Sequence, residues 1–440
     1  MQISELQDKK IAILGFGLEG QSTLKFLLKN GVSKENITLL DQKDIADNQG
    51  VEAVTWEEYL SGLSRFDKIF KTPGISPYHP KIARNKEKLT SQVEVFFANY
   101  EWKVIGVTAT KGKSTTVTLI HEALKGAWVD SKLVGNIGQP VLDEIDLSKP
   151  HDYVVYELSS FMLEWIKPKM EIGLLGNVFR CHLDWHNDDF EVYKMAKHNV
   201  LEGAKYRISN IKLIPELKVP HVRYFGADGD YMYKGGSFMI HGQEVFNDQD
   251  VLLKWEHNRI NIISVVGVMD IISQTGWPDR QLLLDSLKKV VASFTGLPHR
   301  LQEVGTFKGV TFVDDSISTT PESTIEAIKT YDASIGTLLL GWHDYGFEFE
   351  SFAKFLADKK IKNIVFFPDT WAAIKKALDK LGHTYNSISV DSMEKAIKFA
   401  YENTKAWQVV LLSCASPSFS MYDNYKERWD DFKNIAKKLG

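Results

Sequence analysis

The run at residues 108–115, Thr-Ala-Thr-Lys-Gly-Lys-Ser-Thr, combines a glycine turn with a lysine and hydroxyl side chains. A short apolar stretch precedes the run and a helical pattern follows it. Backbone N–H groups at the start of such a helix attract phosphate oxygens. Lys113 adds a positive charge, and Ser114 or Thr115 adds a hydroxyl that can bind Mg²⁺. The run therefore predicts a nucleotide phosphate site made by Thr110, Lys111, Gly112, Lys113, Ser114 and Thr115.

A second glycine motif, of the form G-x-G-x-x-G, contains Gly15, Gly17 and Gly20. Asp41 ends the next apolar run, at the spacing of a carboxylate that binds a ribose. Taken alone, this motif predicts an NAD(P)-dependent oxidoreductase. The same backbone geometry cradles any diphosphate, and a redox reaction leaves Lys113 without a role. We therefore keep the oxidoreductase as the second hypothesis.

Both motifs belong to a chain that alternates short apolar strands with helices, which is typical of an α/β fold with parallel sheets. Strands are expected at residues 10–14, 37–40, 66–70, 104–108, 153–157, 172–177, 310–313, 337–340, 364–367 and 409–412. Helices are expected at residues 20–30, 93–100, 114–124, 258–272 and 279–291, and hairpins within 219–251.

Three domains are expected along this pattern. A Rossmann-like domain covers residues 1–97, and a central P-loop domain with a mostly parallel sheet covers residues 98–296. The turn-rich run Thr-Gly-Leu-Pro at residues 295–298 marks the second boundary. Residues 297–440 form a second Rossmann-like domain.

The composition is that of a soluble globular protein, with 44% hydrophobic and 25% charged residues among 440. A net charge of −4 gives no bulk attraction to nucleic acid or to an anionic membrane. Cys181 and Cys414 lie far apart, with no metal-ligand spacing around them, which favours a reducing compartment. The first ten residues lack the apolar core of a signal peptide. We therefore expect a cytoplasmic protein.

Seven further strings follow one another in an order that matches a known family. They are Gly135-Asn136-Ile137-Gly138, Glu157-Leu158-Ser159-Ser160-Phe161, His182-Leu183-Asp184, Lys197, His257-Asn258-Arg259-Ile260-Asn261, Gly296-Leu297-Pro298-His299-Arg300 and Asp315-Ser316. Together with the phosphate run they resemble the Mur ligases over essentially the whole chain.

The resemblance implies an ATP-dependent amide ligase with ATP and Mg²⁺ as cofactors. In such enzymes ATP phosphorylates a carboxylate, and the amine of an amino acid then attacks the acyl phosphate. The implied substrates are UDP-N-acetylmuramoyl-L-alanine and glutamate, in its D or L form, in peptidoglycan precursor synthesis. A monomer without nucleic-acid or membrane partners is expected. A Mur-like protein that binds nucleotide but has lost catalysis is a further alternative.

The resemblance also implies roles for particular residues. Catalysis would involve Lys113, His182 and Lys197, and the metal would be held by Ser114, Glu157, His182 and a carbamylated Lys197. Asn258, Asn261, Arg300 and Asp315 would complete the ATP site. The UDP substrate would contact Leu18, Glu19, Asp41, Pro73, Gly74, Asn136, Ser159 and His182. A strand-end glutamate such as Glu157 can alternatively cap the helix that follows it.

Six positions depart from the family pattern, and two of them lie near the expected substrate, where Met162 replaces a glutamine and Cys181 an acidic residue. Ala109 stands where glycine is usual, and Lys111 where asparagine is usual. Ile317 and Tyr345 occupy positions that usually carry lysines near the amino acid. A second carboxylate on the amino acid needs donors or positive charge. Hydroxyl groups are expected to supply these donors, and the candidate residues are Thr319, Ser418 and Tyr425.

Overall fold

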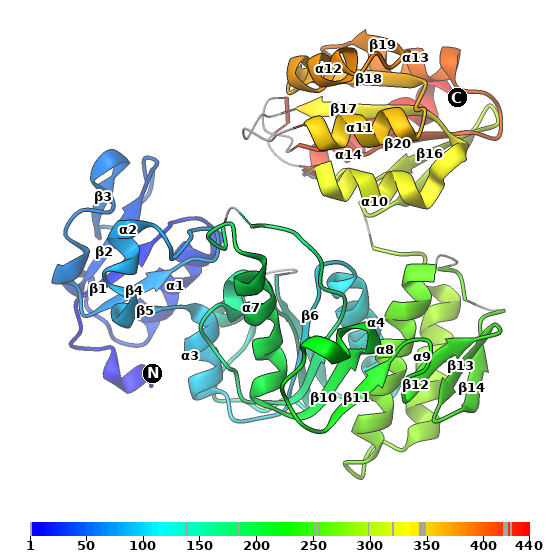
Figure 1. Ribbon diagram of the computed structural model, residues 1–440. Coiled ribbons are helices and arrows are strands. Elements are labelled where there is room, and N and C mark those ends of the chain that lie inside the picture. The colour runs from blue at the N-terminus through cyan, green and yellow to red at the C-terminus, as the bar shows by residue number, and fades with distance from the viewer. Residues whose placement is uncertain are drawn as a thin grey trace. The chain divides into compact units, whose positions relative to one another are not determined.

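The computed structural model describes residues 2–136, 140–183, 185–249, 251–253, 256–297, 299–318, 321–342, 349–416, 421–422 and 425–440. The chain divides into two compact units, Met1–Phe294 and Thr295–Gly440. Its strands form three sheets flanked by helices, which confirms the predicted α/β class (Figure 1). Among the described residues, no helix is long and apolar enough to cross a membrane.

The first sheet has the strand order β3-β2-β1-β4-β5, and all its pairs are parallel. Its strands are β1 (Ile11–Leu14), β2 (Ile37–Asp41), β3 (Glu52–Thr55), β4 (Lys68–Lys71) and β5 (Leu89–Thr90). Successive side chains point to opposite faces, so Ile13 of β1 packs on one side and Leu14 on the other. The first side is covered by α1 (Leu18–Lys29) and α3 (Gln92–Asn99), and the second by α2 (Pro80–Ala83).

The second sheet has nine strands in the order β14-β13-β12-β11-β10-β9-β6-β8-β7. They are β6 (Val104–Thr108), β7 (Ser131–Gly135), β8 (Tyr153–Glu157), β9 (Met170–Leu175), β10 (Ala204–Asn210), β11 (Val222–Phe225), β12 (Tyr231–Lys234), β13 (Ser237–Ile240) and β14 (Gln243–Asn247). The pairs from β7 to β12 are parallel, and β12, β13 and β14 form antiparallel hairpins.

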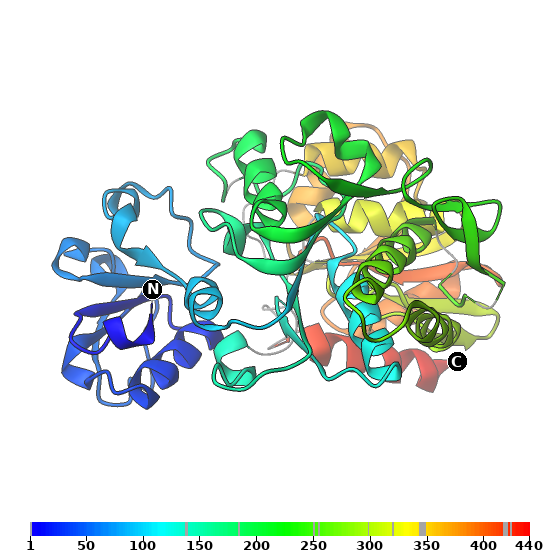
Figure 2. The same ribbon diagram turned by 90° about the horizontal axis from the view of Figure 1, so that it is seen from below.

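Helices cover both faces of this second sheet. One face carries α4 (Lys113–Gly126), α8 (Glu256–Ser273) and α9 (Arg280–Ser293), which lie against one another (Figures 1 and 2). The other carries α5 (Val141–Glu144), α6 (Ser160–Leu163) and α7 (Phe190–Glu202). Strand β6 leads to α4 on one face, whereas its neighbours β8 and β9 lead to α6 and α7 on the other. The carboxyl end of β6 is thus a topological switch point, where ligands of α/β proteins bind.

The third sheet, in the second unit, has the order β15-β16-β20-β17-β18-β19, and only β15 is antiparallel to its neighbour. Its strands are β15 (Gln302–Phe307), β16 (Val310–Asp314), β17 (Ile335–Trp342), β18 (Asn363–Asp369), β19 (Asn386–Ser389) and β20 (Val409–Leu412). One face packs on α10 (Pro321–Tyr331), α11 (Glu350–Asp358) and α12 (Trp371–Lys380). The other packs on α13 (Met393–Asn403) and α14 (Tyr425–Leu439).

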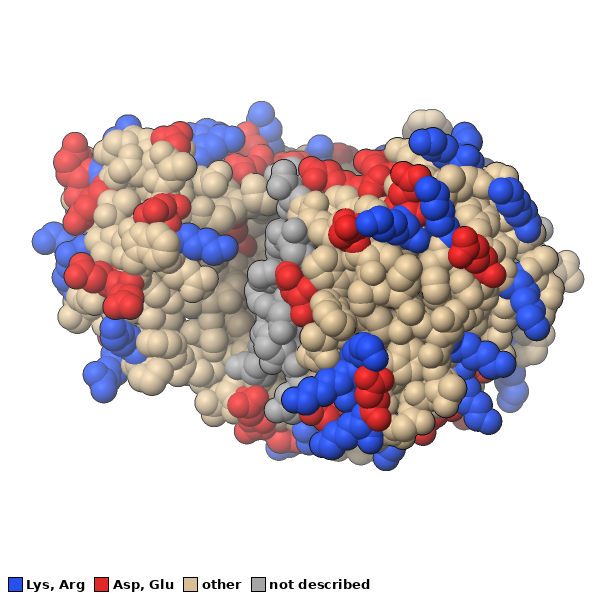
Figure 3. Space-filling model, turned by 90° about the horizontal axis from the view of Figure 1, so that it is seen from above, with Lys and Arg blue, Asp and Glu red and all other residues tan. Residues whose placement is uncertain are grey.

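Short 3₁₀ helices complete the described secondary structure at Ile3–Glu5, Lys34–Asn36, Trp56–Glu58, Leu63–Arg65, Lys86–Lys88, Ile211–Glu216 and Asp332–Ser334. The segment at residues 219–251 departs from its prediction, because β11 pairs in parallel with β10 and only the later strands form hairpins. Both signs of charge are interspersed on the face drawn in Figure 3, which agrees with the small net charge of −4.

Candidate active site

The phosphate loop connects the buried strand β6 to helix α4. Its last residue, Gly112, has a φ of 88°, a left-handed conformation that favours glycine. A Cβ atom at this position would lie 2.4 Å from Asn261 Oδ1, so the loop packs directly on α8. Asn258 is buried one turn earlier on the same helix, and Ser114 is buried at the start of α4. The structure thus brings Asn261 to the loop, with Asn258 beside it on α8.

Asn177 holds the loop from just beyond the end of β9, and the sequence reasoning did not assign it to the site. Its backbone oxygen accepts a hydrogen bond from Thr110 N at 2.7 Å. Its side-chain Oδ1 accepts from Lys111 N at 2.8 Å, and its Nδ2 donates to Lys111 O at 2.9 Å. One residue therefore fixes both backbone groups of Lys111 and sets the shape of the loop.

Replacing Asn177 with alanine is expected to raise the KM for ATP about tenfold and to lower the free energy of unfolding by about 2 kcal/mol, because two side-chain hydrogen bonds are lost. Steady-state kinetics and urea unfolding measure the two effects. Asn48→Ala, at an exposed turn of the first sheet, is the control and should leave the KM for ATP unchanged. An unchanged KM for ATP in Asn177→Ala would contradict the role of Asn177 in shaping the phosphate loop.

Lys197 of α7 is buried beneath the phosphate loop. Its Nζ donates to Ala109 O at 2.9 Å and lies 4.9 Å from the centroid of the Tyr193 ring. Tyr193 Oη in turn lies 2.8 Å from Thr110 Oγ1. Lys113 Nζ also donates to Ala109 O, at 3.0 Å. The two lysine amines thus converge on a single carbonyl of the loop.

Burial lowers the pKa of Lys197 well below its ordinary value. The nearby Lys113 ammonium lowers this pKa further, whereas Cys181 and Glu157 act in the opposite direction. A lysine with a depressed pKa is neutral at a lower pH than usual, and the neutral amine is the nucleophilic form. This is the form that the predicted carbamylation requires.

Glu157 ends β8, in register with Val107 of the neighbouring β6. It is 1% exposed, and its Oε1 accepts a hydrogen bond from Asn136 Nδ2 at 3.2 Å. The alternative role as a helix cap is not what the structure shows, since Ser159 Oγ caps α6 by accepting from Met162 N at 3.2 Å. Glu157 Oε2 is buried and makes no hydrogen bond to a described residue. A spare buried carboxylate oxygen is a ligand that suits Mg²⁺.

Of the other predicted metal ligands, Ser114 lies in the first turn of α4 and Lys197 lies on α7. His182 lies exposed on the loop after β9, with its ring centroid 5.2 Å from that of Phe161. No cluster of three or more His, Cys, Asp or Glu side chains in the described part of the chain is arranged to hold a metal. The fit to Mg²⁺ therefore rests on Glu157 and the buried Ser114. Asp184, beside His182 in its motif, lies outside the described residues, as do Ile137 and Gly138.

Five of the predicted UDP-binding residues, Leu18, Glu19, Asp41, Pro73 and Gly74, lie at the carboxyl edge of the first sheet, whereas Asn136, Ser159 and His182 follow strands of the second. A Cβ atom at Gly15 would lie 2.3 Å from Thr72 Oγ1, so the glycine motif packs on the turn that contains Pro73 and Gly74. Asp41 Oδ2 accepts a hydrogen bond from Phe16 N at 2.7 Å, which brings the end of β2 to the same loop. Leu18 begins α1 and is 74% exposed.

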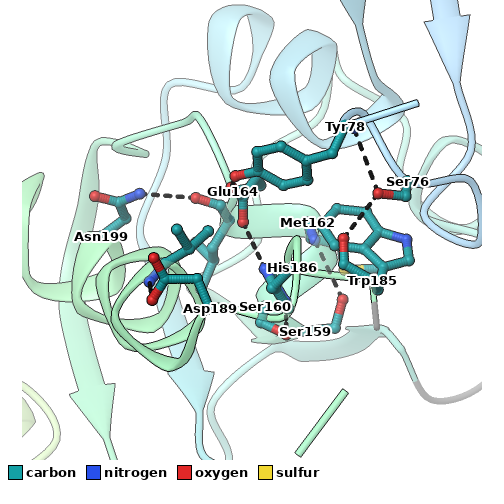
Figure 4. Close-up of polar contacts among 12 residues, drawn as sticks. Ser76, Tyr78, Ser159, Ser160, Met162, Glu164, Trp185, His186, Asp189 and Asn199 are labelled. Carbon is teal, nitrogen blue, oxygen red and sulfur yellow. Dashed lines mark hydrogen bonds and ion pairs between the residues drawn. The ribbon is translucent and has the colours of Figure 1, made fainter. Parts of the chain in front are cut away.

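A polar network joins the loop after this turn to the second sheet (Figure 4). The Tyr78 hydroxyl donates to Glu164 Oε1, and the buried His186 places its Nδ1 2.9 Å from Glu164 Oε2. Ser76 Oγ donates to Trp185 O at 2.8 Å. The loop that carries His182 is therefore anchored to the loop that follows Pro73 and Gly74.

Lys71 is a buried cation behind the same turn. Its Nζ donates to Thr72 O at 2.9 Å and to Ile75 O at 2.6 Å, and it lies 5.2 Å and 5.1 Å from the ring centroids of Trp165 and Trp185. Burial lowers the pKa of Lys71 to about 7, although Glu19 and Glu164 oppose this shift. The Lys71 side chain thus holds the turn by two hydrogen bonds, while its burial disfavours the charged form.

Glu19, at the start of α1, interacts electrostatically with Lys71. Burial raises the pKa of Glu19 to about 7, and Lys71 opposes the shift. The folded protein therefore keeps this proton up to about pH 7, whereas the unfolded chain loses it near the ordinary glutamate pKa of 4.5. Stability is consequently expected to fall as the pH rises through this window.

Glu19→Gln is expected to remove that fall, because glutamine does not titrate. The free energy of unfolding, measured with urea at several pH values between 4.5 and 7, should then vary less in the variant than in the wild type. Glu5→Gln, at an exposed position near the N-terminus, is the matched control and should retain the wild-type dependence. Identical pH profiles for Glu19→Gln and the wild type would contradict the assignment.

The second unit contains the other predicted site residues. Asp315 is 5% exposed, its Oδ2 accepts from Ser413 Oγ at 2.7 Å, and burial raises its pKa to about 6. Arg300 is exposed, and its backbone N donates to Leu297 O at 3.3 Å. Thr319, Ser418 and Tyr345 lie outside the described residues. Tyr425 begins α14, but its side chain lies outside the description as well.

Several residues that support the candidate site were not predicted from the sequence, and they share one property. Each lies outside the recognised strings and reaches the site only through the fold; they are Lys71, Glu164, Asn177, His186 and Tyr193. A sequence signal existed for two of them. Asn177 follows a buried strand, and Tyr193 lies four residues before Lys197, on the same face of a helix.

Known proteins match this chain both over its full length and over the middle domain that contains the phosphate loop. Residues 107–228 match the Mur ligase middle domain. A UDP-N-acetylmuramoylalanine--D-glutamate ligase of Clostridium botulinum (strain Langeland) is 32% identical over 462 residues, covering 98% of this chain and 97% of that protein. A protein of the same name from Clostridium tetani is also 32% identical, covering 99% and 98%.

Solved structures with low identity share the fold over nearly the whole chain. The UDP-N-acetylmuramate-alanine ligase of Thermotoga maritima has a TM-score of 0.59 at 16% identity and covers 98% of this chain and 100% of its own. A MurF ligase of the same organism in complex with ADP has a TM-score of 0.58 at 18% identity and covers 100% and 97%. Since the 32% identity extends over full-length relatives and the phosphate loop lies in the matched middle domain, the chain belongs to the Mur ligase family.

Proposed function

We propose that this chain is an ATP-dependent amide ligase that joins D-glutamate to UDP-N-acetylmuramoyl-L-alanine in peptidoglycan precursor synthesis. The observation that carries the proposal is the phosphate loop, with Lys113 and Lys197 bonded to the same Ala109 carbonyl, in a chain that matches ligases of this name from end to end. The reaction would form an acyl phosphate on the substrate carboxylate and then an amide, with release of ADP and phosphate.

The loop supplies most of what phosphoryl transfer needs, which is positioning and charge. The N-terminus of α4 faces the phosphates with its backbone N–H groups, and Asn177 keeps the preceding loop in shape. Lys113 would leave the carbonyls of its own loop and neutralise the charge that develops on the transferring phosphoryl group.

Magnesium would be held by Glu157 and the hydroxyl of Ser114, together with His182 and a carbamylated Lys197. Mg²⁺ supplies charge neutralisation and orients phosphate oxygens in sites of this kind. Asn136 donates a hydrogen bond to one carboxylate oxygen of Glu157, so the other oxygen is left to bind Mg²⁺. Carbamylation would turn the neutral amine of Lys197 into an anionic oxygen donor beneath the loop.

The UDP portion would bind along the glycine motif, Asp41 and the turn of Pro73 and Gly74. Leu18 is exposed there to meet the uracil, and Asn136 and Ser159 would meet the muramoyl portion. Asp41 already accepts the Phe16 amide, which places the carboxylate over the motif. The same geometry would suit a nicotinamide dinucleotide, and a fluorescence titration with NADH tests that second candidate; tight binding unaffected by ATP would favour it.

The amino acid, the magnesium requirement, the monomeric state and the cytoplasmic location belong to the proposal as well. A phosphate-release assay with UDP-N-acetylmuramoyl-L-alanine, ATP and a panel of D- and L-amino acids tests its core. Phosphate release should require both substrates and should be fastest with D-glutamate. A preference for L-glutamate would correct the stereochemistry alone. Absence of release with every amino acid would overturn the ligase and leave a nucleotide-binding relative without catalysis.

A further inference from the structure

Arg428 of α14 is a buried cation whose own contacts do not account for its charge. It is 0% exposed, and its guanidinium carbon lies 4.6 Å from the centroid of the Trp342 ring. Its Nη2 donates to Ser316 O at 2.5 Å. Its Nε and Nη1 are buried without a hydrogen-bond partner among the described residues, none of which forms an ion pair with it. The buried carboxylates of Asp314 and Asp315 precede Ser316 but are engaged by His299, the Ser316 amide and Ser413, so two guanidinium nitrogens of Arg428 keep donor capacity for a further anion.

Two further donors beside Arg428 are also unsatisfied. Ser316 Oγ is buried and makes no hydrogen bond to a described residue, and the same holds for Trp342 Nε1. Both residues already contact Arg428, Ser316 through its backbone oxygen and Trp342 through its ring. Hydroxyl, indole and guanidinium groups all donate hydrogen bonds. All three groups can therefore donate to one hydrogen-bond acceptor, and the positive guanidinium favours an acceptor that is negatively charged.

The position of these groups in the third sheet is the second argument. Ser316 follows β16 and Trp342 ends β17, and these two strands flank β20. The chain leaves β16 and β17 toward α10 and α11 on one face, but leaves β20 toward α14 on the other. The carboxyl end of β20 is thus a topological switch point, which is where ligands of open α/β sheets bind.

We propose that Arg428, with Ser316 Oγ and Trp342 Nε1, receives a carboxylate of the amino-acid substrate; this inference rests on the ligase function proposed above. The substrate amine must be free to attack the acyl phosphate, so its carboxylates are the groups left for recognition. A guanidinium pairs with a carboxylate more strongly in a dehydrated site than in water. Glutamate carries two carboxylates, and the site has the donors for one of them.

Two substitutions separate charge from shape at this position. Arg428→Met removes the charge and the donors, and Arg428→Lys keeps the charge. Lys433→Met, at an exposed position of the same helix, is the matched control. The KM values for D-glutamate, ATP and UDP-N-acetylmuramoyl-L-alanine are measured for each variant and for the wild type, all as the full chain.

Arg428→Met is expected to raise the KM for D-glutamate about 100-fold, as loss of one partner of a buried charge pair does, with the other two KM values within about twofold. Arg428→Lys should recover part of the loss. D-Glutamine identifies the carboxylate that is bound. If the KM for D-glutamine is the same in Arg428→Met and in the wild type, Arg428 binds the side-chain carboxylate. If that KM rises as much as the KM for D-glutamate, Arg428 binds the α-carboxylate.

The inference is overturned if the KM for D-glutamate stays within about twofold of the wild type in Arg428→Met, or if all three KM values rise together. If the methionine variant does not fold, Arg428→Lys and the wild type decide. D-Glutamate should then raise the melting temperature of the wild type more than that of Arg428→Lys, and equal shifts would overturn the inference. An inactive wild type would instead refute the ligase function itself.

Discussion

Replacing Lys113 with methionine is expected to lower kcat/KM roughly 10³-fold, which is the size of effect seen when a charge-stabilising donor is removed from a phosphoryl-transfer or oxyanion site. Methionine keeps the length of the side chain and removes its positive charge. The ammonium lies at the loop, bonded to the carbonyls of Ala109 and Thr110. Loss of charge at the transferring phosphoryl group should therefore reduce kcat more than it changes the KM for ATP.

Lys125→Met is the matched control for this variant. Lys125 lies in the last turn of the same helix α4, where its Nζ is 3.5 Å from Glu122 Oε1 at the surface. Exposed ion pairs of this kind contribute little to stability, so activity and stability should stay near the wild type. Phosphate release by Lys113→Met within threefold of the wild-type rate would refute the role assigned to the loop.

Lys197→Met is expected to lower turnover at least about 100-fold, because a proposed Mg²⁺ ligand is lost. It should raise the free energy of unfolding by about 1 kcal/mol, because methionine removes the cost of burying an amine that is charged in the unfolded chain. The residue is 2% exposed, and it makes hydrogen bonds only to Ala109 O and Thr108 Oγ1 among the described residues. Kinetics and urea unfolding on the same preparation measure both changes.

Lys194→Met, on the same helix, should show the opposite pattern. Lys194 Nζ lies 2.7 Å from Glu191 Oε1 and 3.2 Å from Glu216 Oε2, and these partners raise its pKa. Its loss should lower stability slightly and leave turnover intact. If Lys197→Met lost enough stability to account for its loss of activity, Lys197 would act through packing alone.

The pH dependence provides a second test of Lys197. Its pKa is depressed in the folded protein, whereas in the unfolded chain it lies near the ordinary lysine value of 10.5. Between these values the unfolded chain holds the extra proton, so the stability of the wild type should rise with pH through this window. Lys197→Met should lack that contribution. If its free energy of unfolding rose with pH as steeply as that of the wild type, the depressed pKa of Lys197 would be contradicted.

Much of the fold followed from the sequence because its central strands are continuous apolar runs. Strands β6 and β8 have the predicted limits, 104–108 and 153–157, since both are buried on both faces and turns end them sharply. Strand β10 was missed because Lys205 and Arg207 interrupt its pattern. Its place between β9 and β11 depends on long-range pairing, which local patterns do not report.

The candidate site likewise contains residues that the sequence predicts and residues that only the fold brings to it. Residues of the phosphate loop are contiguous, so their chemistry is readable from spacing alone. Asn177 joins the loop only because β9 pairs with β6, and Lys71 meets Trp185 only because the first two sheets share a polar network. Arg428 belongs to no motif, and its two unsatisfied nitrogens become evident only when its burial is known.

The most direct test of the central claim follows an oxygen atom. UDP-N-acetylmuramoyl-L-alanine labelled with ¹⁸O in its carboxylate is incubated with the protein, ATP, Mg²⁺ and D-glutamate, and the released phosphate is analysed by mass spectrometry. An acyl-phosphate ligase breaks the bond between that carboxyl carbon and the bridging oxygen, so each released phosphate should contain one ¹⁸O atom. Amide product accompanied by unlabelled phosphate, or phosphate released without amide product, would contradict the proposed mechanism.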